Sequence, residues 1–351
     1  MATKGKNLTM QKEQINTLVR KNILSLKPYS SARDEFSGSD GVFLDANENP
    51  FGELNRYPDP HQQELKHKLS AIKNVPVSSV FVGNGSDEVI DLTFRIFCNP
   101  GKDKALTFSP TYGMYEVSAE INDVELIKIP LTTDFQIDFD SLKNYLGDEN
   151  LKLIFICSPN NPTANSLDNI ESVLQTFNGI VVVDEAYIDF SKASSFLTKI
   201  DQYPNLIVMQ TFSKAWGLAA ARVGMAYSNE LIISMYNKVK PPYNVSKPNQ
   251  DAALKALGDV AGFEKRKSTI LGQKAWLQNQ LEGLAVVIKI YPSDANFLLV
   301  EMTDANRIYN ELVNLKVITR NRHTQVNNCI RITVGSPEEN LVLVEALKKI
   351  K

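Results

Sequence analysis

Apolar and polar positions follow two periods along the chain, which predict short strands separated by helices. Six continuous apolar runs rich in β-branched residues are too short for helices and predict buried strands. They lie at residues 80–82, 105–108, 124–129, 153–156, 180–183 and 206–209. Helical patterns lie between several of them, at residues 87–98, 112–120 and 169–177. Strands that are apolar on both faces and alternate with helices predict an α/β fold with a mainly parallel sheet covered on both sides.

The pattern changes after about residue 229 and predicts a second, smaller α+β domain. Helical periodicity covers 230–239 and roughly 249–284, and strands near 286–290, 297–300 and 329–334 alternate with helices at 306–315 and 337–350. Residues 27–55 have little periodicity and many turn formers, which predicts an ordered arm. We therefore expect an N-terminal arm (1–50) that packs on the small domain or on a partner subunit, a large domain (51–240) and a small C-terminal domain (241–351).

Composition excludes several functional classes. Among 351 residues, 38 Lys and Arg face 40 Asp and Glu, so there is no basic field to attract nucleic acid or an anionic membrane. No apolar run approaches the roughly 18 residues of a membrane span. Three cysteines without CxxC spacing predict neither a disulfide framework nor a zinc site, and His61 and His67 lack neighbours at metal-ligand spacing. We expect a soluble, cytoplasmic protein without a metal, whose partners are small molecules or other protein chains.

Ligands of parallel sheets bind at the carboxyl ends of the strands, so the residues that follow each predicted strand are candidates for a site. GNGSDE (83–88) follows the first strand and places Ser86 at the expected N-cap of a helix, with Asp87 and Glu88 in the first turn. Free N–H groups at such a helix start suit a phosphate. The alternative is an ordinary cap with acidic residues placed for the helix dipole.

A second candidate, QTFSKAWGLAAAR (210–222), follows the strand at 206–209. Its Lys214 adjoins apolar residues, where burial lowers the pKa of an amine and allows attack on an aldehyde. Thr211, Ser213 and Arg222 offer hydroxyls and a guanidinium to an anion. A solvated surface lysine is the alternative interpretation of Lys214.

Two further strand ends carry Asp184 and Asn161. Asp184 closes an all-apolar strand, where a carboxylate is costly unless it faces a positive partner such as a pyridinium N–H; a structural hydrogen bond is the alternative. Asn161 precedes Pro162 in a turn and leaves its amide free to donate, although a turn without a ligand is equally simple. A lysine can react with an aldehyde, and an acid can pair with a pyridine nitrogen. A hydrogen-bond donor can bind a phenolic oxygen, and a helix start can bind a phosphate. Together the four strand ends describe a site for pyridoxal phosphate.

The chain resembles the fold-type I pyridoxal-phosphate enzymes of the class II aminotransferase group, over nearly its whole length after the first ~20 residues. More narrowly, it is similar to the histidinol-phosphate aminotransferase family. The matching motifs are KPYSSARDE (27–35), LDANENPFG (44–52), RYPDP (56–60), GNGSDE (83–88), SPTYGMYEVSAE (109–120), SPNNPTA (158–164), VDEAYIDF (183–190), FSKAWGLAAARVG (212–224) and IRITVGSPEEN (330–340). The resemblance implies a large domain built on a mainly parallel sheet of the seven-stranded type.

The resemblance also implies a role for each candidate at the cofactor. Lys214 would hold pyridoxal phosphate as an aldimine, Asp184 would face its pyridine nitrogen, and Tyr112 would stack on its ring. Asn161 and Tyr187 would bind its phenolic oxygen. The phosphate contacts would come from Ser86, Asp87, Thr211, Ser213 and Arg222, with Tyr57 reaching over from the second subunit of a homodimer with shared active sites.

Substrates would be held by arginines and by the arm. Arg331 would bind the α-carboxylate of the amino donor, or a substrate phosphate in the same pocket. Arg320 would be the second arginine, although Arg322 lies so close that either of the two is a candidate for contacting the substrate. Tyr29 and Asn47 of the arm would line the substrate site.

Two positions depart from the family pattern. The usual NPTG turn ends in Ala164, and the usual GLAGLR-like segment reads GLAAAR at 217–222. Both changes keep small residues, so we expect slight shifts of the backbone and no loss of chemistry.

The main hypothesis is amino transfer between glutamate and imidazole-acetol phosphate in histidine biosynthesis, with histidinol phosphate as the phosphorylated amine. An aromatic amino-acid aminotransferase is the first alternative, favoured if no phosphate pocket forms. A decarboxylase or lyase on the same scaffold is a second, because the cofactor serves several bond cleavages. A non-catalytic cofactor-binding module is a third.

Overall fold

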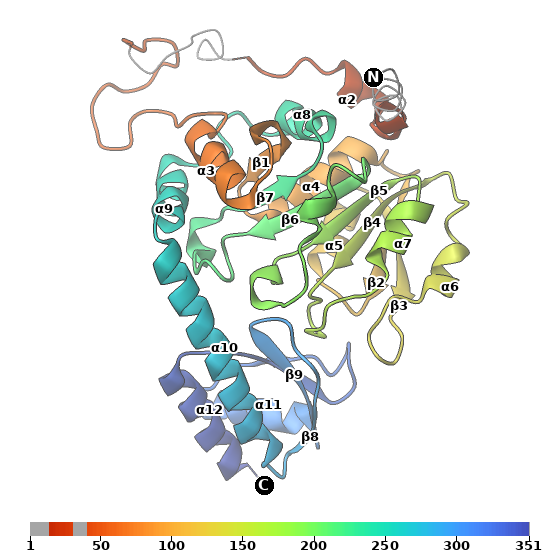
Figure 1. Cartoon of the computed structure of the whole chain (residues 1–351), viewed down its shortest axis with the longest axis vertical. Coiled ribbons are helices and arrows are strands. Elements are labelled where there is room, and N and C mark those ends of the chain that lie inside the picture. The colour runs from red at the N-terminus through yellow and green to blue at the C-terminus, as the bar shows by residue number, and fades with distance from the viewer. Residues whose placement is uncertain (1–13, 31–40, 351) are drawn as a thin grey trace.

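The structure is a computed structural model that describes residues 14–30 and 41–350 (Figure 1). Its larger sheet has seven strands in the order β1-β7-β6-β5-β4-β2-β3. Across the sheet these are β1 (Val80–Gly83), β7 (Gly224–Tyr227), β6 (Leu206–Thr211), β5 (Ile180–Asp184), β4 (Leu151–Cys157), β2 (Lys104–Ser109) and β3 (Glu125–Pro130). The strands from β6 to β3 are parallel, and only β7 runs antiparallel to its neighbours. The predicted mainly parallel sheet is confirmed.

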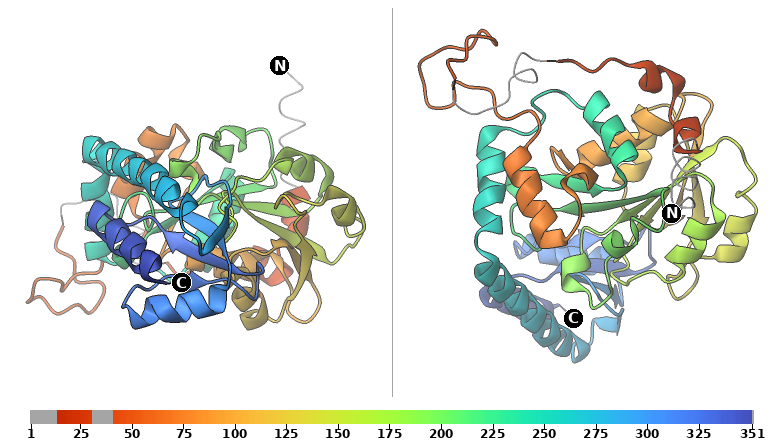
Figure 2. Two further views of the ribbon diagram at one scale, coloured as in Figure 1. Left: turned by 90° about the horizontal axis from the view of Figure 1, so that it is seen from below. Right: turned by 45° about the horizontal axis from the view of Figure 1, so that its top comes forward.

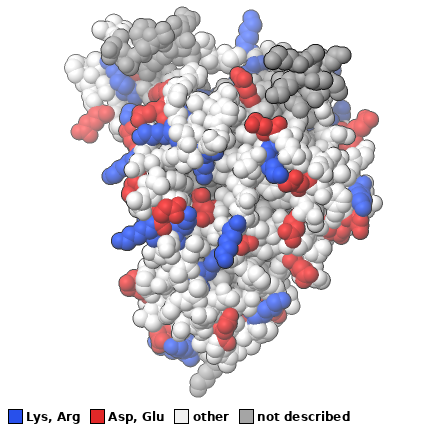
Figure 3. All heavy atoms as spheres, in the orientation of Figure 1, with Lys and Arg blue, Asp and Glu red and all other residues white. Residues whose placement is uncertain are grey.

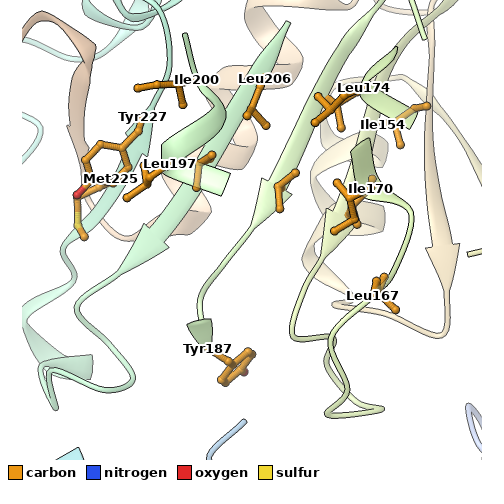
Figure 4. Packing of buried hydrophobic residues seen from close by; sticks show 14 of the residues in the cluster. Ile154, Leu167, Ile170, Leu174, Tyr187, Leu197, Ile200, Leu206, Met225 and Tyr227 are labelled. Carbon is orange, nitrogen blue, oxygen red and sulfur yellow. The ribbon is translucent and has the colours of Figure 1, made fainter. Parts of the chain in front are cut away.

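Helices cover both faces of this sheet because each inner strand is apolar on both sides. In β5, Ile180 and Val182 pack with helices α4 (Ser86–Phe97), α5 (Met114–Ile121) and α8 (Glu230–Val239). Val181 and Val183 face the other layer, which includes α3 (Gln63–Lys73) and α7 (Ile170–Thr176). Figure 4 shows this second layer, in which Ile170 and Leu174 of α7 lie beside Ile154 of the sheet. The remaining short helices are α2 (Lys21–Ser25), α6 (Phe139–Lys143) and the 3₁₀ turns Val77–Ser79, Ile188–Phe190, Phe196–Lys199 and Ala219–Ala221.

The smaller sheet is antiparallel and lies at the other end of the molecule (Figures 1 and 2). Its strand order is β10-β11-β9-β8, and helices α10, α11 and α12 share its apolar core. The bounds are β8 (Val287–Ile290), β9 (Phe297–Met302), β10 (Arg320–Asn321), β11 (Cys329–Thr333), α10 (Val260–Glu282), α11 (Ala305–Asn314) and α12 (Pro337–Lys349). Division into an arm (1–50), a large domain (51–240) and a small domain (241–351) remains our proposal.

One predicted helix is two helices in the structure. The expected helix over 249–284 is interrupted between α9 (Lys247–Leu257) and α10, because Asp259 caps a new start by accepting a hydrogen bond from the N–H of Gly262. The sequence analysis also missed α3, although its Leu65, Leu69 and Ile72 recur at helical spacing, and it missed the short strands β7 and β10, which have no periodic pattern.

The arm projects from the end of the molecule opposite the small sheet (Figure 1). Residues 46–48 and 53–59 line a hollow of about 760 Å³ together with Tyr243 and the start of α9. Val42, Leu44 and Phe51 are each more than four-fifths exposed, with fractions of 89%, 85% and 82%. Residues 1–13 and 31–40 of the arm, which include residues 31–35 of the KPYSSARDE motif, lie outside the described residues. Exposed apolar side chains at this density are of the kind found at interaction surfaces.

The surface carries both charge signs. Figure 3 shows acidic and basic side chains interspersed on the face in view, without a broad patch of one sign. Within residues 14–30 and 41–350, no helix has the length and apolar character needed to cross a membrane.

Candidate active site

A cavity of about 430 Å³ lies between the carboxyl ends of the large sheet's strands and the edge of the small sheet. It is lined by Ser86, Asp87, Tyr112, Cys157, Asn161, Asp184, Ala186, Tyr187, Thr211, Ser213, Lys214, Ala219, Arg222, Arg320, Arg322 and Arg331. Twelve of the fifteen residues that were assigned a cofactor or substrate role from the sequence are in this set, together with Arg322, the alternative to Arg320. The geometry thus brings together candidates that are up to 245 residues apart in the sequence, from Ser86 to Arg331.

The start of α4 forms one wall of the cavity. Gly85, with a φ of +78°, is its N-cap, so the expected N-cap at Ser86 was wrong by one residue. Glycine is favoured there because other residues rarely adopt this positive φ, and a Cβ at Gly85 would also displace the guanidinium of Arg222. No side chain caps the first turn, and Ser86 and Asp87 line the cavity. This helix start can therefore receive an anion.

Arg222 and Tyr112 meet at the carboxylate of Asp87. Nη2 of Arg222 lies 3.1 Å from Oδ2 of Asp87, and the hydroxyl of Tyr112 donates to Oδ1 at 3.1 Å. These contacts hold the guanidinium beside the start of α4. Burial and the charge of Asp87 raise the pKa of Tyr112, which therefore remains a neutral hydrogen-bond donor.

Asp184 is buried at the end of β5 without a cationic contact. Its Oδ2 accepts a hydrogen bond from the hydroxyl of Tyr115 at 2.7 Å, and its Oδ1 accepts one from the N–H of Ala186 at 3.0 Å. Burial raises the pKa of Asp184 to about 6, although both hydrogen bonds and the charge of Lys214 act in the opposite direction. A carboxylate in this state gains stability from any cationic N–H donor that enters the cavity.

Lys214 follows β6, the strand next to β5, and lines the same cavity. Its Nζ lies 5.5 Å from the centroid of the Tyr187 ring. Burial and the charge of Arg331 lower the pKa of Lys214, while Asp184 and Asp87 act to raise it. The lowered pKa gives a larger neutral fraction near pH 7, which an amine needs to act as a nucleophile or base.

Asn161, Tyr187 and Arg331 form a connected group. Nδ2 of Asn161 donates to the hydroxyl of Tyr187 at 3.4 Å, and Nη1 of Arg331 donates to Oδ1 of Asn161 at 2.5 Å. The guanidinium of Arg331 also lies 5.3 Å from the centroid of Phe297. These contacts fix the orientation of the Asn161 amide, which donates toward Tyr187.

The turn that carries Asn161 shows what the Ala164 departure does. Ala164 is fully buried with a φ of +69°, in the region that favours glycine. The N–H of Ala164 donates to the carbonyl of Asn160, and the carbonyl of Ala164 accepts from the N–H of Asp294. These two hydrogen bonds hold the turn in place. The glycine usual in the family fits this conformation better, and the chain keeps the turn with alanine.

Three expected residues do not line the cavity within one chain. Tyr29 is 72% exposed, and Asn47 borders the hollow beside α9. Tyr57 stacks on Tyr243, with ring centroids 4.3 Å apart. Their expected roles remain predictions, and that of Tyr57 requires a second subunit.

The sequence analysis missed Tyr115, whose hydroxyl contacts Asp184. A signal was present, because Tyr115 lies three residues after Tyr112 and so projects near it from the start of α5; their rings meet edge to face at 5.7 Å. Cys157 also lines the cavity, and burial raises its pKa, so this thiol is not a nucleophile. Cys98 and Cys329 are likewise buried and unpaired.

The donor set fits pyridoxal phosphate. A helix start with Arg222 suits its phosphate, the buried Asp184 suits a pyridinium N–H, and the neutral fraction of Lys214 suits its aldehyde. In the described part of the chain, no group of three or more His, Cys, Asp or Glu is placed to hold a metal ion.

Comparison with known proteins gives consistent matches. The family model described as aminotransferase class I and II matches residues 36–347. The histidinol-phosphate aminotransferase of Cytophaga hutchinsonii is 51% identical over 343 residues, covering 95% of this chain and 98% of the relative. That of Flavobacterium johnsoniae is 50% identical, with coverage of 95% and 98%. The crystal structure of the Sinorhizobium meliloti histidinol-phosphate aminotransferase in complex with pyridoxal 5′-phosphate superposes with a TM-score of 0.75 and 25% identity, covering 84% of this chain and 83% of that chain.

Proposed function

The chain belongs to the histidinol-phosphate aminotransferase family of the class I and II aminotransferases, and from this premise we propose how its cavity performs amino transfer. The enzyme is a pyridoxal-phosphate-dependent transaminase of histidine biosynthesis. The amino group moves between the glutamate/2-oxoglutarate pair and the histidinol phosphate/imidazole-acetol phosphate pair. The observation that carries this proposal is the cavity that brings Lys214 and Asp184 together with the three arginines of the small sheet's edge, Arg320, Arg322 and Arg331.

Cofactor binding uses residues of the large sheet. We assign the phosphate to the start of α4, with Ser86 and Asp87 offering backbone N–H groups, and to the three side chains of Thr211, Ser213 and Arg222. Tyr112 lies beside this group and is assigned to stack on the ring. Asn161 and Tyr187 are assigned to the phenolic oxygen, and Lys214 to the covalent link.

The residues around the cofactor divide the chemical work. When bound, pyridoxal phosphate supplies a ring that accepts the electron pair released at the substrate α-carbon. Asp184, as a carboxylate, keeps the ring nitrogen protonated, and Tyr115 holds that carboxylate in position. Lys214 takes the proton from the α-carbon of the amino donor as a base, and returns a proton as an acid. Its lowered pKa makes the neutral form of the amine, which acts as the base, easier to reach than in a solvated lysine.

Arginines select anionic substrates. Arg320 and Arg331 are paired directly across β10 and β11, so both side chains lie on the same face of the small sheet. We assign Arg331 to the α-carboxylate of glutamate and to the phosphate of histidinol phosphate, because a guanidinium binds either group at two points. Arg320 completes this subsite.

We propose that two chains assemble into a homodimer in the cytoplasm. Exposed apolar residues of the arm need a cover, and in a two-fold dimer Tyr57, Tyr29 and Asn47 complete the partner's site. The buried, unpaired cysteines suit a reducing compartment.

A transamination assay tests the proposal. The purified holoenzyme is mixed with L-histidinol phosphate and 2-oxoglutarate, and glutamate formation is followed; L-phenylalanine replaces histidinol phosphate in a parallel arm. We expect turnover with histidinol phosphate that exceeds turnover with phenylalanine, and none with Lys214→Ala. Preference for phenylalanine would instead identify an aromatic aminotransferase.

A further inference from the structure

Three guanidiniums converge on the cavity from the edge of the small sheet. Side chains of a strand alternate between its faces, so Arg320 and Arg322 lie on one face and Asn321 on the other. Arg331 lies opposite Arg320 and therefore shares this face, whereas its neighbours Ile330 and Ile332 are buried on the opposite one. All three arginines line the cavity.

No carboxylate of the described residues neutralises these three arginines. None of them forms an ion pair, and Arg331 donates instead to the neutral amide of Asn161. Nε of Arg322 is closed off from solvent and has no hydrogen-bond partner. Burial and the charges of Arg331 and Arg320 lower the pKa of Arg322 to about 10. Such crowding of like charges is destabilising unless an anion binds among them.

The backbone of Arg322 is held firmly. Its N–H donates to the carbonyl of Cys329 at 2.9 Å, which extends the β10–β11 pairing by one residue, and its carbonyl accepts from the N–H groups of Gln325 and Val326 at 2.8 Å. The side chain of Arg322 therefore projects from a fixed point of the backbone, so no backbone ordering is needed when an anion binds.

We propose that Arg322 is a specificity residue that makes the subsite of Arg320 and Arg331 select a phosphate monoester dianion over a carboxylate. This inference rests on the proposed function and deepens it. A carboxylate carries one negative charge and two oxygens, which Arg331 alone can satisfy at two points. A phosphate monoester near pH 7 carries nearly two charges and three acceptor oxygens, so it can use a third cationic donor.

Half-reactions of the holoenzyme separate the two substrates, because each involves a single amino donor. The absorbance change of the bound cofactor is followed with histidinol phosphate or with glutamate, for the wild type, Arg322→Gln and Arg322→Lys. Arg307→Gln is the matched control, since Arg307 lies on α11 and pairs with Glu311 outside the cavity. We expect Arg322→Gln to lower the second-order rate constant for histidinol phosphate about ten- to hundredfold, because one hydrogen bond to a charged group is lost. The rate constant for glutamate should fall much less. The rate constant of Arg322→Lys for histidinol phosphate should lie between those of the wild type and Arg322→Gln, because lysine keeps the charge and loses the planar guanidinium.

A binding measurement gives a second readout. Inorganic phosphate, added to the holoenzyme at constant ionic strength so that the cofactor already occupies its own phosphate site, should raise the melting temperature of the wild type and of Arg307→Gln more than that of Arg322→Gln. The inference would be overturned if Arg322→Gln lowered the half-reaction rate constants for histidinol phosphate and glutamate equally, or lowered neither. A wild type that does not react with histidinol phosphate would refute the proposed function itself, which is a separate result.

Discussion

The hydroxyl of Tyr115 donates a 2.7 Å hydrogen bond to Oδ2 of Asp184, and both side chains are buried. Tyr115 also stacks on Phe155, with ring centroids 4.9 Å apart, so its hydroxyl has little freedom to leave. The bond favours the ionised form of Asp184, which burial disfavours. We therefore infer that Tyr115 is a positioning residue that would act on the cofactor through Asp184.

Tyr115→Phe should therefore weaken catalysis without emptying the site. Loss of a hydrogen bond to a carboxylate costs about 1.5–3 kcal/mol, so we expect the pKa of Asp184 to rise and kcat to fall about tenfold or more. The absorbance of the bound cofactor, recorded against pH, should shift relative to the wild type. Tyr236→Phe is the control, because Tyr236 is equally buried but pairs with Thr93 outside the cavity. Identical pH profiles for Tyr115→Phe and the wild type would exclude a positioning role.

Asp184→Asn should stabilise the cofactor-free protein and impair the loaded enzyme. The pKa of Asp184 is about 6 in the fold against an ordinary value of 3.8, so the folded state binds more protons between about pH 4 and 6. The free energy of unfolding therefore falls as pH rises through this window, and the cost persists above it at up to about 3 kcal/mol. Thermal unfolding of the cofactor-free proteins should show a gain for Asp184→Asn at pH 7.5 that shrinks toward pH 4. Half-reaction rates of the loaded variant should drop sharply although cofactor content changes little; near-normal rates would contradict the role of Asp184.

Lys214 should be the residue that carries the cofactor. Borohydride reduction of the holoenzyme fixes pyridoxal phosphate on the lysine that holds it, and peptide mapping then identifies that lysine. Burial also lowers the pKa of Lys66 and Lys274, but neither lines the cavity. A label on either of them would show that a lowered pKa alone, and not the geometry of the cavity, selects the site.

Mixed dimers test whether active sites are shared. Tyr57→Phe and Lys214→Ala homodimers should each have low activity. After subunit exchange, hybrid dimers contain one site with both native residues, so up to about one quarter of wild-type activity per chain should return if exchange is random. No recovery after exchange confirmed by native mass spectrometry, or a fully active monomer by light scattering, would place Tyr57 outside the partner's site.

Much of the large sheet could be predicted from the sequence because its inner strands are continuous runs of apolar, mostly β-branched residues. In β5, four consecutive apolar β-branched residues precede Asp184, and the acid at the end of such a strand required a partner. By contrast β7 gave no signal. Gly224 must be glycine because a Cβ there would lie 2.3 Å from the N of Ser86. The strand β7 passes so close to the start of α4 that it has glycine where a β-branched or aromatic residue would have marked a strand.

Contacts between residues distant in the sequence could not be predicted. Nothing in the sequence pattern aligns Arg320 with Arg331, since their register depends on the turn between them and on the two-residue β10. The hydrogen bond between Tyr115 and Asp184 likewise depends on how α5 packs on the sheet. The sequence left open whether Arg320 or Arg322 contacts the substrate, and in the structure both line the cavity.

The most direct test of the account compares kcat/KM for histidinol phosphate with that for unphosphorylated histidinol in the wild-type enzyme. The arginine cluster should contribute roughly 2–5 kcal/mol of binding to the phosphate in the transition state, which corresponds to a preference of about 30-fold to several thousandfold. Arg331→Lys should remove most of that preference, because lysine cannot reproduce the two-point geometry of the guanidinium. Equal values for the two amines in the wild type would contradict the account, because they would mean that no phosphate subsite exists in this cavity.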